Sequence, residues 1–138
     1  MTDWIRCQKP LQDLKELGCL QLAWLGDAVW EMHQRLRHCH RPGNSKDLHI
    51  SVVSEVRAAS QAKALTQLDP YLNANERNLI KRGRNRSKRG PRGVDAATYG
   101  KATGFETMVG WLFLKEPERL AHLFALLEES KNDFSSGE

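Results

Sequence analysis

The sequence predicts an all-α protein, and three observations support this prediction. Apolar residues recur at helical spacing along most of the chain. No stretch alternates apolar and polar residues between turn dipeptides, as a strand in a half-buried sheet would. Glycine, proline and capping side chains divide the apolar pattern into about six helices. The 138 residues are enough for a single domain, 1–138, with one modest core.

Two helices are predicted in the first part of the chain. A short helix over 11–17 ends at Gly18, and a longer helix over 20–39 ends before the turn signal "RPGN" at 41–44. The longer helix is rich in apolar residues, so we expect one side of it to be buried.

The middle of the chain predicts two more helices. Ser45 is the expected N-cap of a helix over 46–68, and Pro70 interrupts the pattern after it. A short helix over 73–83 follows. It leads into a segment rich in glycine and arginine, 81–92, which we expect to be a loop.

The last two predicted helices have recognisable start signals. Asp95 is the expected N-cap of a helix over 96–114. Pro117 suits the first position of the final helix, because a backbone N–H would have no partner there. Residues 130–138 are polar, and we expect them to form a flexible tail.

Positive charge is concentrated in one segment. The net charge of +4 says little about partners by itself. The segment 81–92, however, contains no acidic residue and seven cations, which are Lys81, Arg82, Arg84, Arg86, Lys88, Arg89 and Arg92. Such a run either binds nucleic-acid phosphates or is a solvated surface loop.

Membrane and secreted classes are not supported by the composition. No apolar run is long enough to cross a bilayer, and acidic residues stand at the N-terminus where a signal peptide needs a basic segment. The three cysteines form no C-x-x-C pair and do not suggest a disulfide framework. We therefore expect a cytoplasmic protein.

Two acidic residues lie within apolar helical patterns, Asp27 in "LAWLGDAVW" and Glu106 in "ATGFETMVG". A buried ionised carboxylate needs a partner, and no lysine or arginine lies within a turn of Asp27. Asp27 is therefore either exposed or approached by a charged group from elsewhere.

Small residues surround both carboxylates and would let their two helices cross at short range, with the carboxylates at the crossing. These residues are Ala23, Gly26, Ala28, Ala102, Gly104 and Gly110. Two carboxylates held together need a shared proton, a basic partner or a divalent cation. Magnesium suits such a site because it accepts one or two protein carboxylates and completes its shell with waters and a substrate phosphate.

Both motifs resemble the catalytic domain of the ribonuclease III family. The segment "LAWLGDAVWE" is similar to that family's "LGDA" helix, and "ATGFETMVGWLFL" to the segment with its signature glutamate. The resemblance covers about residues 20–129, and 130–138 is too short for a double-stranded-RNA-binding domain. Together with "SKDLH" at 45–49 and "KRGRN" at 81–85, this pattern most resembles Mini-ribonuclease III, which lacks that domain.

The resemblance implies a ribonuclease III-like helical fold and a metal-dependent endoribonuclease that leaves 5′-phosphate and 3′-hydroxyl ends. Asp27 and Glu106 are carried over as the catalytic and metal-binding residues, with Mg²⁺, or alternatively Mn²⁺, as the ion. Ribonuclease III has two further carboxylates, where this chain has Ala23 and Thr103. Without these two carboxylates, the sequence does not support a two-metal site. Mini-ribonucleases III resemble this chain in lacking them.

The resemblance also implies partners. Double-stranded RNA would contact the seven cations of 81–92, and a homodimer would present one site to each strand. The implied substrate is precursor ribosomal RNA of the large subunit (23S-type), and a ribosomal protein is a further candidate partner.

Two other interpretations stay open. One is a non-catalytic RNA-binding or ribosome-associated helical protein that keeps the fold and the basic segment. The other is a helical interaction module whose tryptophans form an oligomer and whose basic segment aids solubility. This second alternative leaves Asp27, Glu106 and the glycines around them without a role, whereas the enzyme interpretation accounts for all of them.

Overall fold

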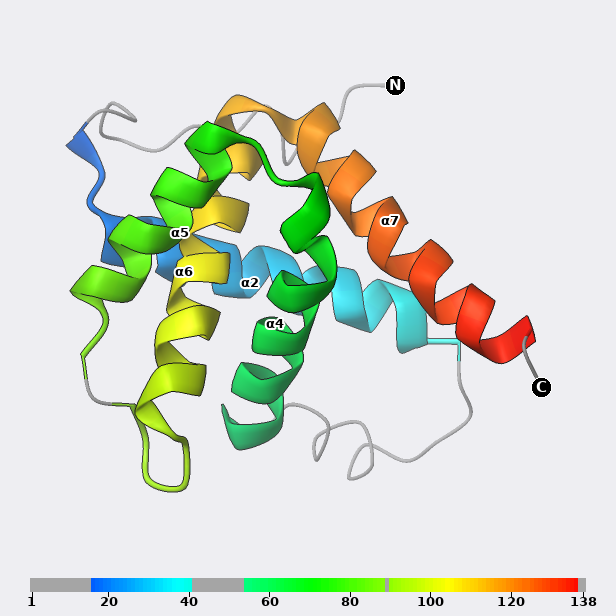
Figure 1. Cartoon of the computed structure of the whole chain (residues 1–138), viewed down its shortest axis with the longest axis horizontal. Coiled ribbons are helices and arrows are strands. Elements are labelled where there is room, and N and C mark those ends of the chain that lie inside the picture. The colour runs from blue at the N-terminus through cyan, green and yellow to red at the C-terminus, as the bar shows by residue number, and fades with distance from the viewer. Residues whose placement is uncertain (1–15, 41–53, 89, 137–138) are drawn as a thin grey trace.

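Helix α6 (Ala96–Lys115) lies at the centre of the fold and packs against four other helices (Figure 1). The computed structural model describes residues 16–40, 54–88 and 90–136. The other elements are α2 (Cys19–His38), α4 (Ser54–Leu68), the short 3₁₀-helix η2 (Asp69–Tyr71), α5 (Ala74–Arg86) and α7 (Pro117–Ser136). No strand occurs in these ranges, and the predicted all-α class is confirmed.

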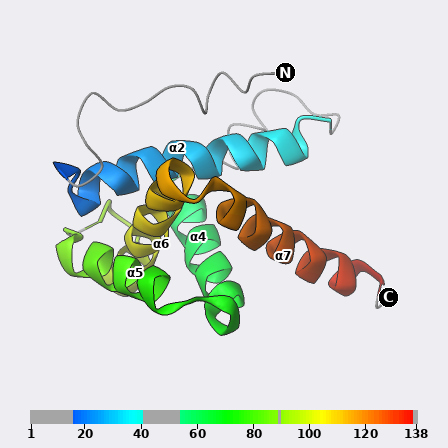
Figure 2. The ribbon, with the colours of Figure 1, turned by 90° about the horizontal axis from the view of Figure 1, so that it is seen from above.

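The helices are arranged around α6 on several sides. Helices α4, α5 and α6 lie side by side, and α2 runs across one side of this group (Figures 1 and 2). Ten residues of α6 are buried, and they are distributed around the whole helix. A helix that is buried all round is typical of the centre of a domain, which explains why this segment combines apolar residues with so many small ones.

Aromatic packing joins α2, α6 and α7 in the core. The ring of Trp30 in α2 meets that of Phe105 in α6 edge-on, with 5.1 Å between centroids. On another side it meets Phe124 of α7, with 5.6 Å between centroids. Edge-to-face contacts of this kind add to the stabilisation that comes from burial alone.

Local capping signals fix where the helices begin. Asp95 accepts hydrogen bonds from the backbone N–H groups of Ala97 and Thr98, as predicted for the start of α6. Pro117 is the first residue of α7, also as predicted. Helix α5 begins with a reciprocal pair, since Asn73 accepts a bond from the Glu76 backbone and the Glu76 carboxylate accepts one from that of Asn73.

The buried carboxylate of Glu76 also ties the start of α5 to α7. It accepts a hydrogen bond from Nε of Arg119 at 2.8 Å. Burial raises the pKa of Glu76. The hydrogen bond from Arg119, the backbone bond from Asn73 and the charge of Arg119 together lower it by more, so the pKa lies below its usual value. This ionised pair helps to hold α5 in place.

Two helices extend beyond their predicted ends. Helix α5 continues to Arg86, so the prediction of a loop over 81–92 is wrong for 81–86. The glycine that suggested a loop, Gly83, is buried against Thr107 of α6, and this packing outweighs its low helix propensity. Helix α7 continues to Ser136, into the segment 130–138 that was predicted to be a flexible tail.

Several predictions lie outside the described residues. These are residues 11–15 of the helix predicted over 11–17, the N-cap Ser45, the first part of the helix over 46–68 with its "SKDLH" segment, and the cation Arg89. Of the helices in the described ranges, none is long and apolar enough to traverse a lipid bilayer.

Candidate active site

Helices α2 and α6 cross with their backbones in direct contact. A Cβ atom built on Gly26 would overlap the carbonyl group of Glu106 and lie 2.9 Å from the backbone nitrogen of Gly110. Conversely, a Cβ on Gly110 would overlap the carbonyl oxygen of Leu22. The expected close crossing of these two segments is therefore confirmed, and Gly26 and Gly110 are the residues that permit it.

Not every small residue in the two motifs faces this crossing. A Cβ on Gly104 would lie 2.6 Å from the carbonyl oxygen of Ile80 and 3.0 Å from Cγ of Arg84, both in α5. Ala28 is exposed. Gly104 therefore permits the approach of α5 to α6, and the expectation that it serves the α2–α6 crossing is wrong.

The crossing brings Asp27 and Glu106 together. Burial of Glu106, followed by the charge and a side-chain hydrogen bond of Asp27, raises the pKa of Glu106 to about 8. A hydrogen bond from Gln61 and the charge of Arg57 act in the opposite direction but do not cancel this effect. The two sequence-predicted site residues thus form one coupled carboxylate pair.

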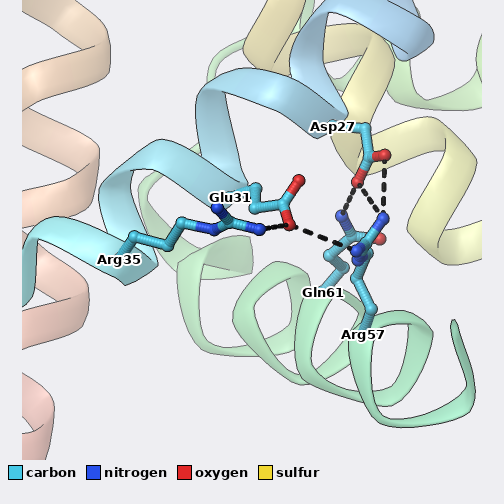
Figure 3. Close-up of polar contacts among 5 residues, drawn as sticks. All are labelled: Asp27, Glu31, Arg35, Arg57 and Gln61. Carbon is cyan, nitrogen blue, oxygen red and sulfur yellow. Dashed lines mark hydrogen bonds and ion pairs between the residues drawn. The ribbon is translucent and has the colours of Figure 1, made fainter. Parts of the chain in front are cut away.

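Helix α4 supplies the charged partner that Asp27 lacks locally (Figure 3). Nη1 of Arg57 donates to the Asp27 carboxylate, at 3.1 Å from Oδ2 and 3.5 Å from Oδ1. Nε2 of Gln61, one turn further along α4, donates to Oδ1 of Asp27 at 3.4 Å. The side chain of Gln61 is almost fully buried, so its amide has a fixed place in the site.

A second carboxylate of α2 shares the same arginine. Nη2 of Arg57 donates to Oε1 of Glu31 at 3.4 Å, while Arg35 donates to the same oxygen at 2.8 Å (Figure 3). Glu31 lies one turn after Asp27, so both carboxylates lie on the face of α2 that meets α4. Arg57 therefore bridges the two acidic residues.

Sequence reasoning missed Arg57, Gln61 and the involvement of Glu31. In retrospect the signal is weak: Arg57 and Gln61 are four residues apart among alanines in "VRAASQAKA", which places both on one helical face. Nothing local links that face to Asp27, because the ion pair connects residues 30 positions apart.

The donor set of the site fits a hard divalent cation. Asp27 and Glu106 offer carboxylate oxygens at one place, whereas the nearby Glu31 is paired with Arg57 and Arg35. The raised pKa of Glu106 reflects repulsion and burial that a divalent cation would relieve. Across 16–40, 54–88 and 90–136, no group of three or more typical ligand side chains forms a complete metal cage. Two carboxylates can hold a hard divalent cation that completes its coordination shell with water and substrate oxygens.

The basic segment forms an exposed surface at the end of α5 and the connection after it. Within the described ranges its cations are Lys81, Arg82, Arg84, Arg86, Lys88 and Arg92, and all are exposed. None of these six forms an ion pair with a described acidic residue. Their charge therefore remains available to an anionic partner.

The chain belongs to the ribonuclease III domain family, whose model matches residues 20–117. Within it, the chain is similar to Mini-ribonuclease 3 of Gloeobacter violaceus, with 43% identity over 87% of this chain and 88% of that one. It is also 44% identical to Mini-ribonuclease 3 of a Synechococcus species, over 82% of each chain.

A solved structure supports the same fold. A crystal structure of a protein from Fusobacterium nucleatum superposes with a TM-score of 0.71 at 27% identity, covering 84% of this chain and 96% of that one. The predicted ribonuclease III-like helical fold is confirmed. Family membership makes the chain an endoribonuclease by class.

Proposed function

We propose that this protein is a Mg²⁺-dependent endoribonuclease that cleaves double-stranded RNA in the cytoplasm, with Asp27 and Glu106 as its catalytic and metal-binding residues. Products would carry 5′-phosphate and 3′-hydroxyl ends, and Mn²⁺ would replace Mg²⁺ in vitro. The observation that carries the proposal is the coupled carboxylate pair at the α2–α6 crossing, in a chain of the ribonuclease III family.

The chain's own residues have distinct tasks in this proposal. A divalent cation, when bound, neutralises charge at the phosphodiester and activates water. Asp27 and Glu106 would hold it through carboxylate oxygens, and Glu106 must give up its proton to do so because its pKa is about 8. Gln61 donates to Asp27 and so orients that carboxylate.

The exposed cations of α5 support double-stranded RNA as the substrate. The bases of an RNA duplex are poorly accessible in its deep, narrow groove, so proteins recognise the duplex through phosphates and 2′-hydroxyls. Arg82, Arg84 and Arg86 lie on a rigid helix that packs on α6, the same helix that carries Glu106. Contacts between these arginines and the phosphates of the RNA would therefore be held in a fixed relation to the carboxylate pair.

An apolar surface on α2 supports the proposed homodimer. The side chain of Trp24 is 83% exposed. Leu20, Met32 and Leu36, on the same helix, are also large and exposed. Large apolar side chains that gather on one exposed helix are typical of an interface. A two-fold dimer would bury this surface and present one site to each strand of a duplex.

Precursor ribosomal RNA of the large subunit is the proposed biological substrate, with a ribosomal protein as a candidate partner that presents it. This part of the proposal rests on the similarity to proteins named Mini-ribonuclease 3. It predicts cleavage of a double-stranded stem within such a precursor at one position on each strand.

The direct test is a cleavage assay on a defined RNA duplex with and without Mg²⁺. We expect metal-dependent cutting by the wild-type protein, and a loss of at least about a hundredfold in Asp27→Asn and Glu106→Gln. Glu118→Gln, in an exposed carboxylate of α7, is the matched control and should cut normally.

Two outcomes would contradict the proposal. Folded Asp27→Asn and Glu106→Gln proteins that cleave at the wild-type rate would remove these residues from the reaction. Binding of both the duplex and precursor ribosomal RNA without cutting by the wild-type protein would favour a non-catalytic RNA-binding role instead.

A further inference from the structure

Among the described residues, Arg57 is a cation bonded directly to a proposed metal ligand, and nothing in the proposed reaction yet uses it. Its side chain is 29% exposed, so it lies at the edge of the site and is neither locked in the core nor free in solvent. Its guanidinium bonds to Asp27, the residue proposed to hold the divalent cation. A cation of the protein therefore already pairs with a carboxylate that the divalent cation would use.

The geometry divides the guanidinium between two carboxylates. Nη1 lies on Asp27 at 3.1 Å, whereas Nη2 lies on Glu31 at 3.4 Å. Because the two bonds use different nitrogens, Arg57 can release Asp27 while it keeps its bond to Glu31. Arg35 also pairs with Glu31, at 2.8 Å, but its side chain is 70% exposed, so this surface pair contributes little to the site.

The charges explain why such a cation is present. Burial and then the charge of Asp27 raise the pKa of Glu106, and the charge of Arg57 acts against this rise. In the absence of metal, the guanidinium limits the free-energy cost of holding two carboxylates together. The same charge would repel a divalent cation that approaches Asp27.

We propose that Arg57 is a built-in competitor of the catalytic metal: it binds Asp27 in the metal-free protein, lowers the affinity of the site for a divalent cation, and is retained by Glu31 when it leaves Asp27. The inference rests on the proposed function of Asp27 as a metal ligand. It adds a second state of the site, in which a released guanidinium stays beside the metal position.

The test is direct Mn²⁺ binding, measured in the absence of RNA from the EPR signal of free Mn²⁺. We expect Arg57→Gln to bind Mn²⁺ about tenfold more tightly than the wild type, because a repelling and competing charge is gone. Arg57→Lys keeps the charge and should stay within about twofold of the wild type. Loss of a merely structural contact would weaken binding, not strengthen it.

Arg35→Gln is the matched control. Arg35 also pairs with Glu31 but has no bond to Asp27, and its side chain is 70% exposed. Its replacement should leave Mn²⁺ affinity within about twofold of the wild type. If Arg35→Gln and Arg57→Gln bind Mn²⁺ with equally increased affinity, the net charge of the protein explains the increase. Direct competition by Arg57 is then wrong.

The outcomes separate this inference from the proposed function. Suppose that the wild type binds Mn²⁺, that Asp27→Asn abolishes this binding, and that Arg57→Gln binds Mn²⁺ no more tightly than the wild type. The proposed competition by Arg57 is then wrong, whereas the proposed metal site at Asp27 is supported. If no variant shows binding that depends on Asp27, both are wrong.

A measurement on the wild-type protein keeps the inference testable if Arg57→Gln does not fold. During a Mg²⁺ titration, the side-chain Nε–Hε resonance of Arg57 in a ¹H–¹⁵N spectrum should shift, while that of Arg77, paired with Asp69 elsewhere, should not. An Arg57 resonance that stays unmoved at saturating Mg²⁺ would overturn the release from Asp27.

Discussion

The backbone of Gly26 in α2 lies directly against the carbonyl group of Glu106 in α6, in a contact that leaves no room for a Cβ atom. Asp27 is the next residue along α2, so the contact that joins the two helices also brings the two carboxylates together. The packing of the fold and the chemistry of the site therefore depend on the same few atoms.

Gly26→Ala should destabilise the protein strongly. The added methyl group would force the α2 and α6 backbones apart, and we expect a loss of about 3 kcal/mol in the free energy of unfolding. Gly100→Ala is the control, because its Cβ would meet Ser87 at an ordinary 3.5 Å and alanine favours a helix. Chemical denaturation of both variants measures the difference. Equal stability of the two would mean that the close crossing is absent in solution.

The pKa of Glu106 predicts how stability depends on pH in metal-free protein. A carboxyl group whose pKa rises from 4.5 to about 8 on folding stabilises the folded state below pH 4.5, and this contribution is lost as pH rises towards 8. Glu106→Gln has no carboxyl group to titrate, so its free energy of unfolding should rise relative to that of the wild type across this window, by roughly 4 kcal/mol between low pH and pH 8.

Thermal or denaturant unfolding with EDTA at pH 5 and pH 8 measures this gain. Glu118→Gln, at an exposed position of α7, should follow the wild type at both pH values. A constant difference between Glu106→Gln and the wild type would show that Glu106 titrates near its ordinary pKa.

The sequence predicted the features that depend on neighbouring residues. Asp95 marks a helix start through bonds to residues within one turn, and Pro117 marks another because it lacks a backbone N–H. Such signals are visible in any sequence. Gly26 and Gly110 marked a close crossing, because several small residues within a helix need a compensating contact.

Long-range contacts explain what the sequence did not predict. The role of Arg57 depends on an ion pair with a residue in another helix, and the end of α5 depends on Gly83 packing against α6. Neither contact has a local pattern. The low helix propensity of Gly83 in "KRGRN" indicated a loop, but the packing of Gly83 against α6 stabilises a helix there.

The exposed cations of α5 predict a salt-dependent affinity for RNA. Arg82→Gln combined with Arg86→Gln should weaken duplex binding at low salt, because each lost phosphate contact reduces the slope of log K against log salt by roughly 0.7–0.9. Arg77→Gln is the control on the same helix, where the arginine is already paired with Asp69. Binding titrations at several salt concentrations give the slopes. Parallel slopes for all proteins would assign the basic surface another task.

The exposed Trp24 predicts how the oligomer can be dissociated. Tryptophan is a frequent centre of binding energy at interfaces, so Trp24→Lys should weaken a dimer that buries α2 by at least about 2 kcal/mol, which is a factor of about thirty in its dissociation constant. Tyr71→Lys is the control, since Tyr71 is also a large exposed aromatic residue, 54% exposed, but lies in η2. Light scattering after size-exclusion chromatography measures the mass of each protein. A Trp24→Lys protein that remains dimeric would place the interface elsewhere, and a monomeric one that still cuts both strands of a duplex would show that the second site is not needed.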